Sequence, residues 1–214
     1  MMTQLLKPSD YITMPWKNGQ GSTAQIHLVP ESAQFPQDEF LWRISSAQVS
    51  GENQFSQFPG YDRWLSVWQG AGLLLNEQKL EAFAPRLFAG ETPIHCQPLS
   101  SDVIDLGAIF RRGQVTAQMT AEHLASQQSR SFTLAQGSHY FFCAQGHLAI
   151  ETLSANSGST LHIDVPSEDR LDAATKAKTQ YEIKNKLVLR NPGIQETRFF
   201  HIYLRKISVS EISS

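Results

Sequence analysis

"FLWRISSAQVSGENQFSQFPGYDRWLSVWQ", residues 40–69, holds two runs of alternating side chains, joined by a loop rich in aromatic residues. Aromatic and β-branched residues in the runs 40–49 and 63–69 are typical of β-strands, and Pro59-Gly60 is typical of a type II turn. The stretch therefore predicts two strands of one β-structure with a turn before the second.

Similar short runs recur along most of the chain, and Gly, Pro, Asn or Ser separates many of them. The predicted strands are 40–49, 63–69, 72–76, 102–110, 114–121, 139–144, 147–153, 160–166, 181–189 and 198–207. Many strands at short spacing predict an all-β sandwich or barrel with little helix. One segment, 167–179, has helix signals in the N-cap Ser167 and its terminal charges, but its apolar face is thin, so a surface helix and a loop both fit.

The composition excludes several classes of partner. The 214 residues carry a formal net charge of −2, so no basic excess is present to attract a nucleic acid. Apolar runs such as "GAGLLL" are too short for a membrane span, and the N-terminus lacks a signal-peptide run, so we expect a cytoplasmic protein. Cys96 and Cys143 lie far apart, and we expect both to be buried thiols.

Two arginines interrupt the strand pattern. Arg43 has the parity of Leu41 and Val49, and Arg63 has the parity of Leu65, so each guanidinium shares a strand face with apolar side chains. If these faces are buried, each arginine needs an anion or several acceptors. In the alternative reading the tryptophans mark the inner face and the arginines point outward. The pattern leaves both readings open.

Two loops are candidate walls for a ligand. "MPWKNGQGST" (14–23) contains Asn18-Gly19, a hairpin signal, and its second glycine also permits close approach of a ligand to the backbone. In "FSQFPGYDR" (55–63), aromatic residues precede a carboxylate and a guanidinium, which suits a small polar ligand.

The seven histidines show neither HxH nor HxxxH spacing, so we expect no metal site. Nucleotide-binding glycine motifs and a nucleophile elbow are also missing from the sequence, and we expect no cofactor.

Three segments resemble, in order, the signature segments of the HutD/Ves family: "MPWKNGQGST", "FLWRISSAQVSGENQFSQFPGYDRWLSVWQGAGLLL" and "FAGETPIHCQPLSSDVIDLGAIFRRG". The resemblance implies a bicupin, two double-stranded β-helix (RmlC-like jelly-roll) barrels at 10–113 and 114–208, packed as one globular unit. It also implies a link to histidine utilisation and a small anionic ligand of the urocanate or formylglutamate type. We expect a protein that governs pathway flux rather than a catalyst.

The residues that match the family's motifs form the expected ligand site. Arg43 and Arg63 would anchor a carboxylate, because a guanidinium binds it through two hydrogen bonds. The expected ligand-binding residues are Lys17, Asn18, Thr23, Arg43, Phe55, Phe58, Asp62, Arg63 and Asp105. The chain departs from the family at Gln20, at Gln25 in place of a usual glutamate, and at Gly107 in place of a common asparagine.

Two alternatives remain at this stage. The protein would be a metal-independent isomerase or hydrolase if burial made Asp62 a general base. It would be a protein-interaction scaffold if the barrel were empty. The sequence leaves the oligomeric state open, a homodimer included.

Overall fold

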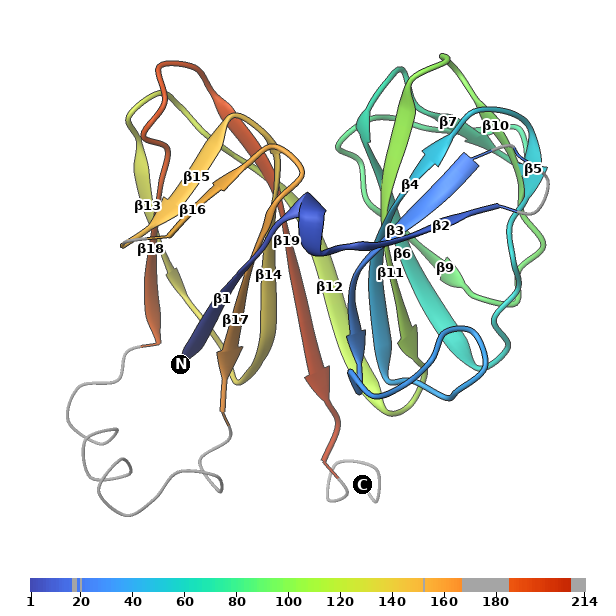
Figure 1. Ribbon diagram of the computed structural model, residues 1–214, viewed down its shortest axis with the longest axis horizontal. Helices are drawn as coiled ribbons and strands as arrows, with labels where there is room; N and C mark the ends of the chain where they lie inside the picture. The colour runs from blue at the N-terminus through green and yellow to red at the C-terminus, as the bar shows by residue number, and fades with distance from the viewer. Residues whose placement is uncertain (17–18, 20, 152, 167–184, 209–214) are drawn as a thin grey trace. The chain divides into compact units, whose positions relative to one another are not determined.

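The computed structural model describes residues 1–16, 19, 21–151, 153–166 and 185–208. These residues form β-strands and one short 3-10 helix, η1 (Pro8–Asp10), so the all-β prediction is confirmed (Figure 1). The contacts divide the chain into an N-terminal unit, Pro8–Met119 with Lys206–Ser214, and a C-terminal unit, Met1–Lys7 with Thr120–Arg205. The expected helix at 167–179 lies outside the described residues.

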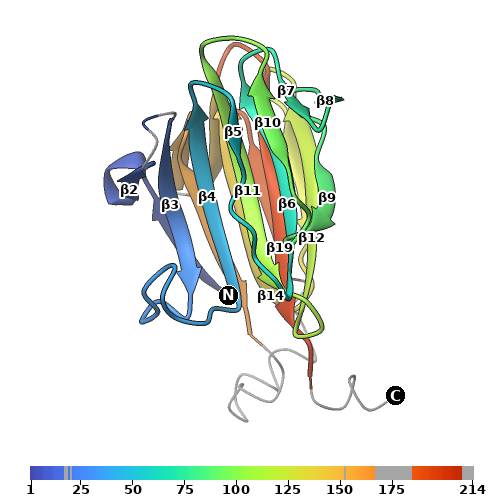
Figure 2. The same cartoon turned by 90° about the vertical axis from the view of Figure 1, so that its right-hand side faces the viewer.

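The N-terminal unit consists of two sheets, and Figure 2 shows the central strands of the larger one side by side. Its six strands, in spatial order, are β2 (Ile12–Pro15), β3 (Gly21–Val29), β4 (Trp42–Val49), β11 (Val103–Arg111), β6 (Tyr61–Gln69) and β9 (Arg86–Ala89). The smaller sheet has the order β5 (Asn53–Gln54), β10 (His95–Pro98), β7 (Leu73–Leu75) and β8 (Gln78–Leu80). The ladders within both sheets are antiparallel.

The C-terminal unit repeats the two-sheet plan. One sheet has the order β1 (Met2–Leu6), β17 (Thr160–Val165), β14 (Gly137–Gln145), β19 (Thr197–Lys206) and β12 (Val115–Leu124). The other has the order β13 (Ser129–Thr133), β18 (Lys186–Arg190), β15 (His147–Ile150) and β16 (Leu153–Asn156). Pairing of β1 with β17 adds the start of the chain to this unit, which the sequence did not predict.

Apolar side chains fill the space between the sheets of each unit. In the N-terminal unit the core joins β4, β6 and β11 to β7, β8 and β10 through Val49, Leu65, Val67, Leu73, Leu75, Leu80, Ile94, Cys96 and Val103. In the C-terminal unit Phe141 and Phe199 are fully buried among leucines and isoleucines. Both cysteines are free and buried, as predicted. Burial of such aromatic and aliphatic side chains is the main stabilising contribution to each unit.

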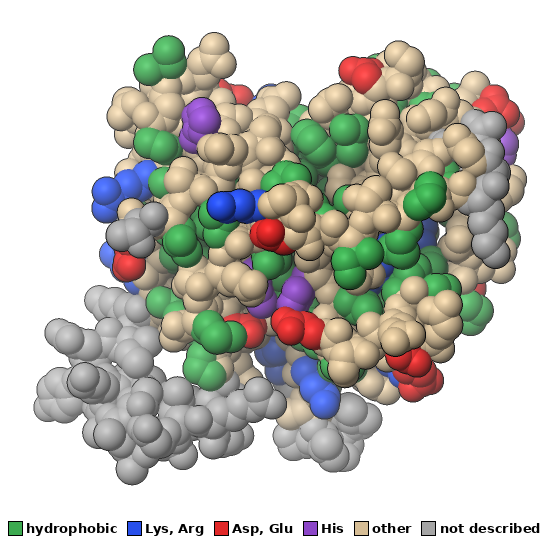
Figure 3. Space-filling view, in the orientation of Figure 1, with side chains coloured by type: hydrophobic (Ala, Val, Ile, Leu, Met, Phe, Trp, Pro, Cys, Tyr) green, Lys and Arg blue, Asp and Glu red, His purple; other side chains and the backbone are tan. Residues whose placement is uncertain are grey.

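Charged side chains of both signs are interspersed on the face shown in Figure 3 rather than gathered into one area. None of the described helices is long and apolar enough to cross a membrane.

Candidate ligand-binding site

Arg43 and Arg63, the two arginines that interrupt the apolar pattern of their strands, lie on the inner face of the large N-terminal sheet. Antiparallel register places Ile109 of β11 between Arg43 of β4 and Arg63 of β6, and directly opposed residues point to the same side of a sheet. That side is the inner one, because Leu65 and Val49, at matching parity, lie in the core. The structure thus agrees with the first of the two sequence-based readings.

Arg43 is 4% exposed, and the two residues that form hydrogen bonds with it are uncharged. Its Nε–H donates to Gln25 Oε1 at 2.9 Å, and its Nη1–H lies 3.4 Å from Ser45 Oγ. The guanidinium carbon lies 3.9 Å from the centroid of the Phe35 ring, a cation–π contact. Burial and, to a smaller extent, the charge of Arg63 together lower the pKa of Arg43 to about 10, although the charge of Asp105 acts to raise it. The side chain is therefore still charged at neutral pH.

Arg63 lies in an aromatic enclosure. Its guanidinium carbon is 5.2 Å from the ring centroid of Phe55, 5.3 Å from that of Phe58 and 5.8 Å from that of Phe88. Its one polar contact within the described chain is long, 3.5 Å from Nη2 to the Ser56 carbonyl oxygen. Burial lowers its pKa to about 10, so it too is charged at neutral pH. Phe55 and Phe58 thus both lie beside the guanidinium of Arg63.

Asp105 lies on the same inner face, four residues along β11 from Ile109. It is 6% exposed, and its Oδ1 accepts a hydrogen bond from the Ala47 N–H at 3.1 Å. Burial raises its pKa to about 7, although Arg63, the Ala47 N–H and Arg43 each act to lower it. Asp105 is thus close enough to both arginines to feel their charge, but it forms no ion pair with either among the described side chains.

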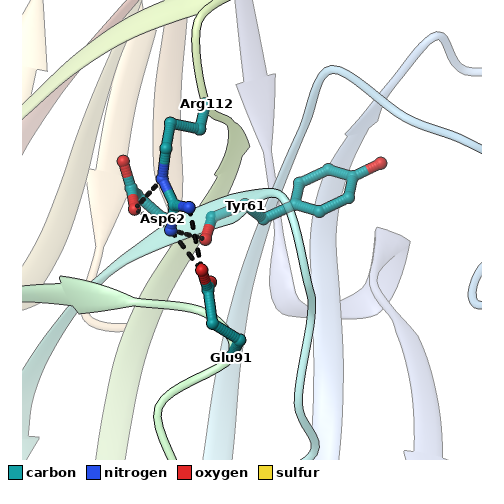
Figure 4. Close-up of polar contacts among 4 residues, drawn as sticks. All are labelled: Tyr61, Asp62, Glu91 and Arg112. Carbon is teal, nitrogen blue, oxygen red and sulfur yellow. Dashed lines mark hydrogen bonds and ion pairs between the residues drawn. The ribbon is translucent and has the colours of Figure 1, made fainter.

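Asp62 is placed elsewhere. It alternates with Arg63 along β6 and so points to the opposite face, where Arg112 Nη2 lies 2.7 Å from its Oδ1 (Figure 4). Arg112 also binds Glu91 at 2.8 Å and donates to the Tyr61 carbonyl oxygen at 3.0 Å. The structure therefore separates Asp62 from the arginine cluster, contrary to the expectation, and gives it a role in joining strand ends.

The remaining expected residues divide into two groups. Thr23 lies on β3 in the same cross-strand row as Ala47 and Asp105, and its Oγ1 accepts a hydrogen bond from Trp16 Nε1 at 2.8 Å. Its hydroxyl oxygen is therefore already engaged with the indole. Lys17 and Asn18 lie outside the described residues.

Sequence reasoning missed three contributors to this cluster. Phe35 belongs to the loop between β3 and β4, and no strand pattern marks it. Phe88 lies directly opposite Arg63 in the register of β9, a short strand that was not predicted. Gln25 was noted only as a departure from the family pattern, whereas the structure shows it holding Arg43. An aromatic residue isolated in a polar loop was the one available signal for Phe35.

The C-terminal unit contains a separate histidine pair. His139 Nε2 lies 2.8 Å from the Ala135 carbonyl oxygen, which can only accept, so this nitrogen carries hydrogen. Burial lowers the pKa of His139 and lowers that of His201 to about 4, so both rings are neutral at pH 7. His201 Nε2–H must then donate to His139 Nδ1, 2.9 Å away. Within the described ranges, no three His, Cys, Asp or Glu side chains gather as a metal site would require.

Comparison with known proteins places the chain in a family. The HutD family model matches residues 8–189, which include both sheets of the N-terminal unit. The chain belongs to the HutD family. It is 33% identical over 145 residues to an uncharacterized 21.2 kDa protein of the hutC 3′ region of Pseudomonas putida, covering 64% of this chain and 75% of that protein. It is 26% identical over 153 residues to protein Ves of Citrobacter koseri, covering 69% and 76%.

Solved structures agree on the fold of this HutD-family chain. HutD from Pseudomonas fluorescens SBW25 superposes with a TM-score of 0.71 at 22% identity, covering 97% of this chain and all of that one. Oxalate decarboxylase from Lactobacillus farciminis superposes with a TM-score of 0.62 at 9% identity, covering 97% and 88%. At these identities the likeness concerns the fold alone, and it shows a cupin-like β-structure, as predicted.

Proposed function

We propose that the N-terminal unit binds a small carboxylate of histidine breakdown, of the urocanate or formylglutamate type, and that the protein governs flux through that pathway. The observation that carries the proposal is the pair Arg43 and Arg63. Two guanidinium groups on one inner face have aromatic rings and uncharged oxygens as their near neighbours within the described chain.

A carboxylate supplies what these arginines lack. Each guanidinium has more N–H donors than the acceptors around it, and a carboxylate accepts two of them in parallel. The rings of Phe35, Phe55 and Phe58 exclude water from the guanidinium faces, which strengthens a charged contact. The name of the Pseudomonas putida relative supports the pathway, since it places that protein beside hutC.

Calorimetric titration of urocanate and formylglutamate tests the proposal. Arg43→Ala and Arg63→Ala should each cost on the order of 2–5 kcal/mol of binding free energy for the ligand that binds. Arg112→Ala is the matched control, because this arginine is paired with Asp62 and Glu91 on the other face. If both site variants bind as tightly as the parent protein, the anchoring role is wrong.

The second candidate function is that of an enzyme. Its general base would be Asp105 rather than Asp62, which is paired with Arg112. A buried carboxyl whose pKa lies near 7 is suited to general acid–base catalysis. Incubation of the protein with each candidate substrate, followed by NMR, would show turnover that Asp105→Asn abolishes. Unchanged substrate spectra would favour the binding protein. The convergence of charged groups on one inner face disfavours an empty scaffold.

A further inference from the structure

Asp105 shares the inner face of the large N-terminal sheet with Arg43 and Arg63. It lies on β11 between β4 and β6, and its directly opposed residues on these two strands are Ala47 and Val67. Each arginine lies four residues away along its own strand, which is about 13 Å at the backbone, and a long arginine side chain spans part of that distance. The carboxyl and the two guanidiniums therefore belong to one buried surface.

No side chain of β11 separates the Asp105 carboxyl from the level of the arginines. Gly107 is the inward-facing residue between Asp105 and Ile109, and a Cβ added there would come no closer than 3.7 Å to another heavy atom, the Leu65 Cδ1. The charges accordingly act on one another across this face. Both arginines act to lower the pKa of Asp105, and the charge of Asp105 acts to raise the pKa of each arginine.

A ligand carboxylate at the arginines would be a second negative charge on the same surface. Cys96 of β10, the other titratable neighbour of Asp105 in the described part of the chain, is uncharged at neutral pH because burial raises the pKa of its thiol to about 12. Asp105 and the ligand would therefore compete for the two positive charges. When two carboxylates share one site, each negative charge disfavours the other, and one of the two groups takes up a proton.

We propose that Asp105 takes up a proton when a carboxylate binds at Arg43 and Arg63, so that the protein binds its ligand more tightly as the pH falls through neutrality. The inference rests on the proposed function and adds a regulation of the same site. A neutral Asp105 leaves both positive charges to the ligand. Because burial already raises the pKa of Asp105 to about 7, a small further rise protonates it at neutral pH.

Calorimetric titration with formylglutamate tests this proton uptake, because both carboxylates of this acid stay ionised above pH 6. The binding enthalpy is measured at pH 7 in MOPS and in Tris, whose heats of protonation differ, and the difference gives the number of protons taken up. We expect about half a proton per ligand at pH 7, and an affinity about tenfold lower at pH 8.5 than at pH 6.5. Equal enthalpies in both buffers, with equal affinities at both pH values, would overturn the inference and leave the proposed function standing.

Asp105→Asn is the matching variant, because it keeps the shape of the side chain but cannot ionise. It should abolish the proton uptake and bind formylglutamate equally at both pH values, about tenfold more tightly than the parent protein at pH 8.5. Asp102→Asn is the control, since this aspartate is exposed and its replacement should preserve the pH dependence. A pH dependence that persists in Asp105→Asn would assign the proton to another group and contradict the inference.

An NMR titration of the Asp105 carboxyl carbon distinguishes this inference from the proposed function. In the free protein the carboxyl should titrate near pH 7, and Arg63→Gln should raise its pKa because a positive charge is lost. An unchanged pKa in Arg63→Gln would refute the coupling, whether or not a ligand binds. If neither formylglutamate nor urocanate binds at any pH, the proposed function itself fails, and the proton uptake fails with it.

Discussion

Replacement of Asp105 by asparagine should stabilise the ligand-free protein, and more so at high pH. The carboxyl has an ordinary pKa of 3.8, and burial raises it to about 7 in the folded state. Between these two values the folded protein binds more protons than the unfolded chain, so its stability falls as the pH rises. Stability from this group is fully present below pH 3.8 and is lost as the pH passes about 7.

The size of the effect follows from the two pKa values. At about 1.4 kcal/mol per pKa unit, ionisation of Asp105 destabilises the folded state by about 2 kcal/mol at pH 5 and about 4 kcal/mol at pH 8. Asparagine cannot ionise, so the unfolding free energy of Asp105→Asn should exceed that of the parent protein by these amounts. Urea unfolding at both pH values measures the difference, and titrations of other groups cancel in the comparison.

Exposed Asp102 provides the matched control, and its replacement by asparagine should alter the free energy of unfolding far less. If the difference in unfolding free energy between the parent protein and Asp105→Asn is the same at pH 5 and pH 8, burial does not raise the pKa of Asp105. The account of the site's charge would then be wrong.

Two substitutions and one NMR titration test the structure at other points. Arg112→Ala should lower the melting temperature slightly, and less at high salt, because its ion pairs with Asp62 and Glu91 are on the surface; salt-independent loss would contradict this. Phe141→Ala should cost roughly 3–5 kcal/mol of unfolding free energy in urea melts, since the ring is fully buried, and a cost under about 1 kcal/mol would refute its packing. His201 should remain neutral in ¹⁵N NMR titrations until about pH 4, with hydrogen on Nε2, and protonation near pH 6.5 would disprove its burial.

The strand content could be predicted from sequence because alternation along 40–49 and 63–69 is a local property. Short strands were missed where few residues carry the pattern, as in β9 (Arg86–Ala89), which places Phe88 opposite Arg63. Likewise β1 has no aromatic residue and only one β-branched residue, Thr3, and pairing with β17 makes it a strand. Long-range pairing of this kind leaves no local signature.

The arginine pair was found from parity, but its surroundings were not. Parity places Arg43 and Arg63 on faces with apolar neighbours, yet it cannot decide which face is inside when tryptophans line the other one. Asp62 was grouped with Arg63 because the two are adjacent in sequence, whereas adjacent residues on a strand point to opposite faces. The contact between Gln25 and Arg43 joins the consecutive strands β3 and β4, and it depends on their register, which shifts between Gln25 and His27 and is not visible in the sequence.

A crystal structure of the protein with formylglutamate tests the central claim most directly. We expect carboxylate oxygens within hydrogen-bonding distance of the guanidinium groups of both Arg43 and Arg63. Three results would contradict the account. They are ligand density at another place, both arginine side chains pointing into bulk solvent, and a metal ion held by histidines.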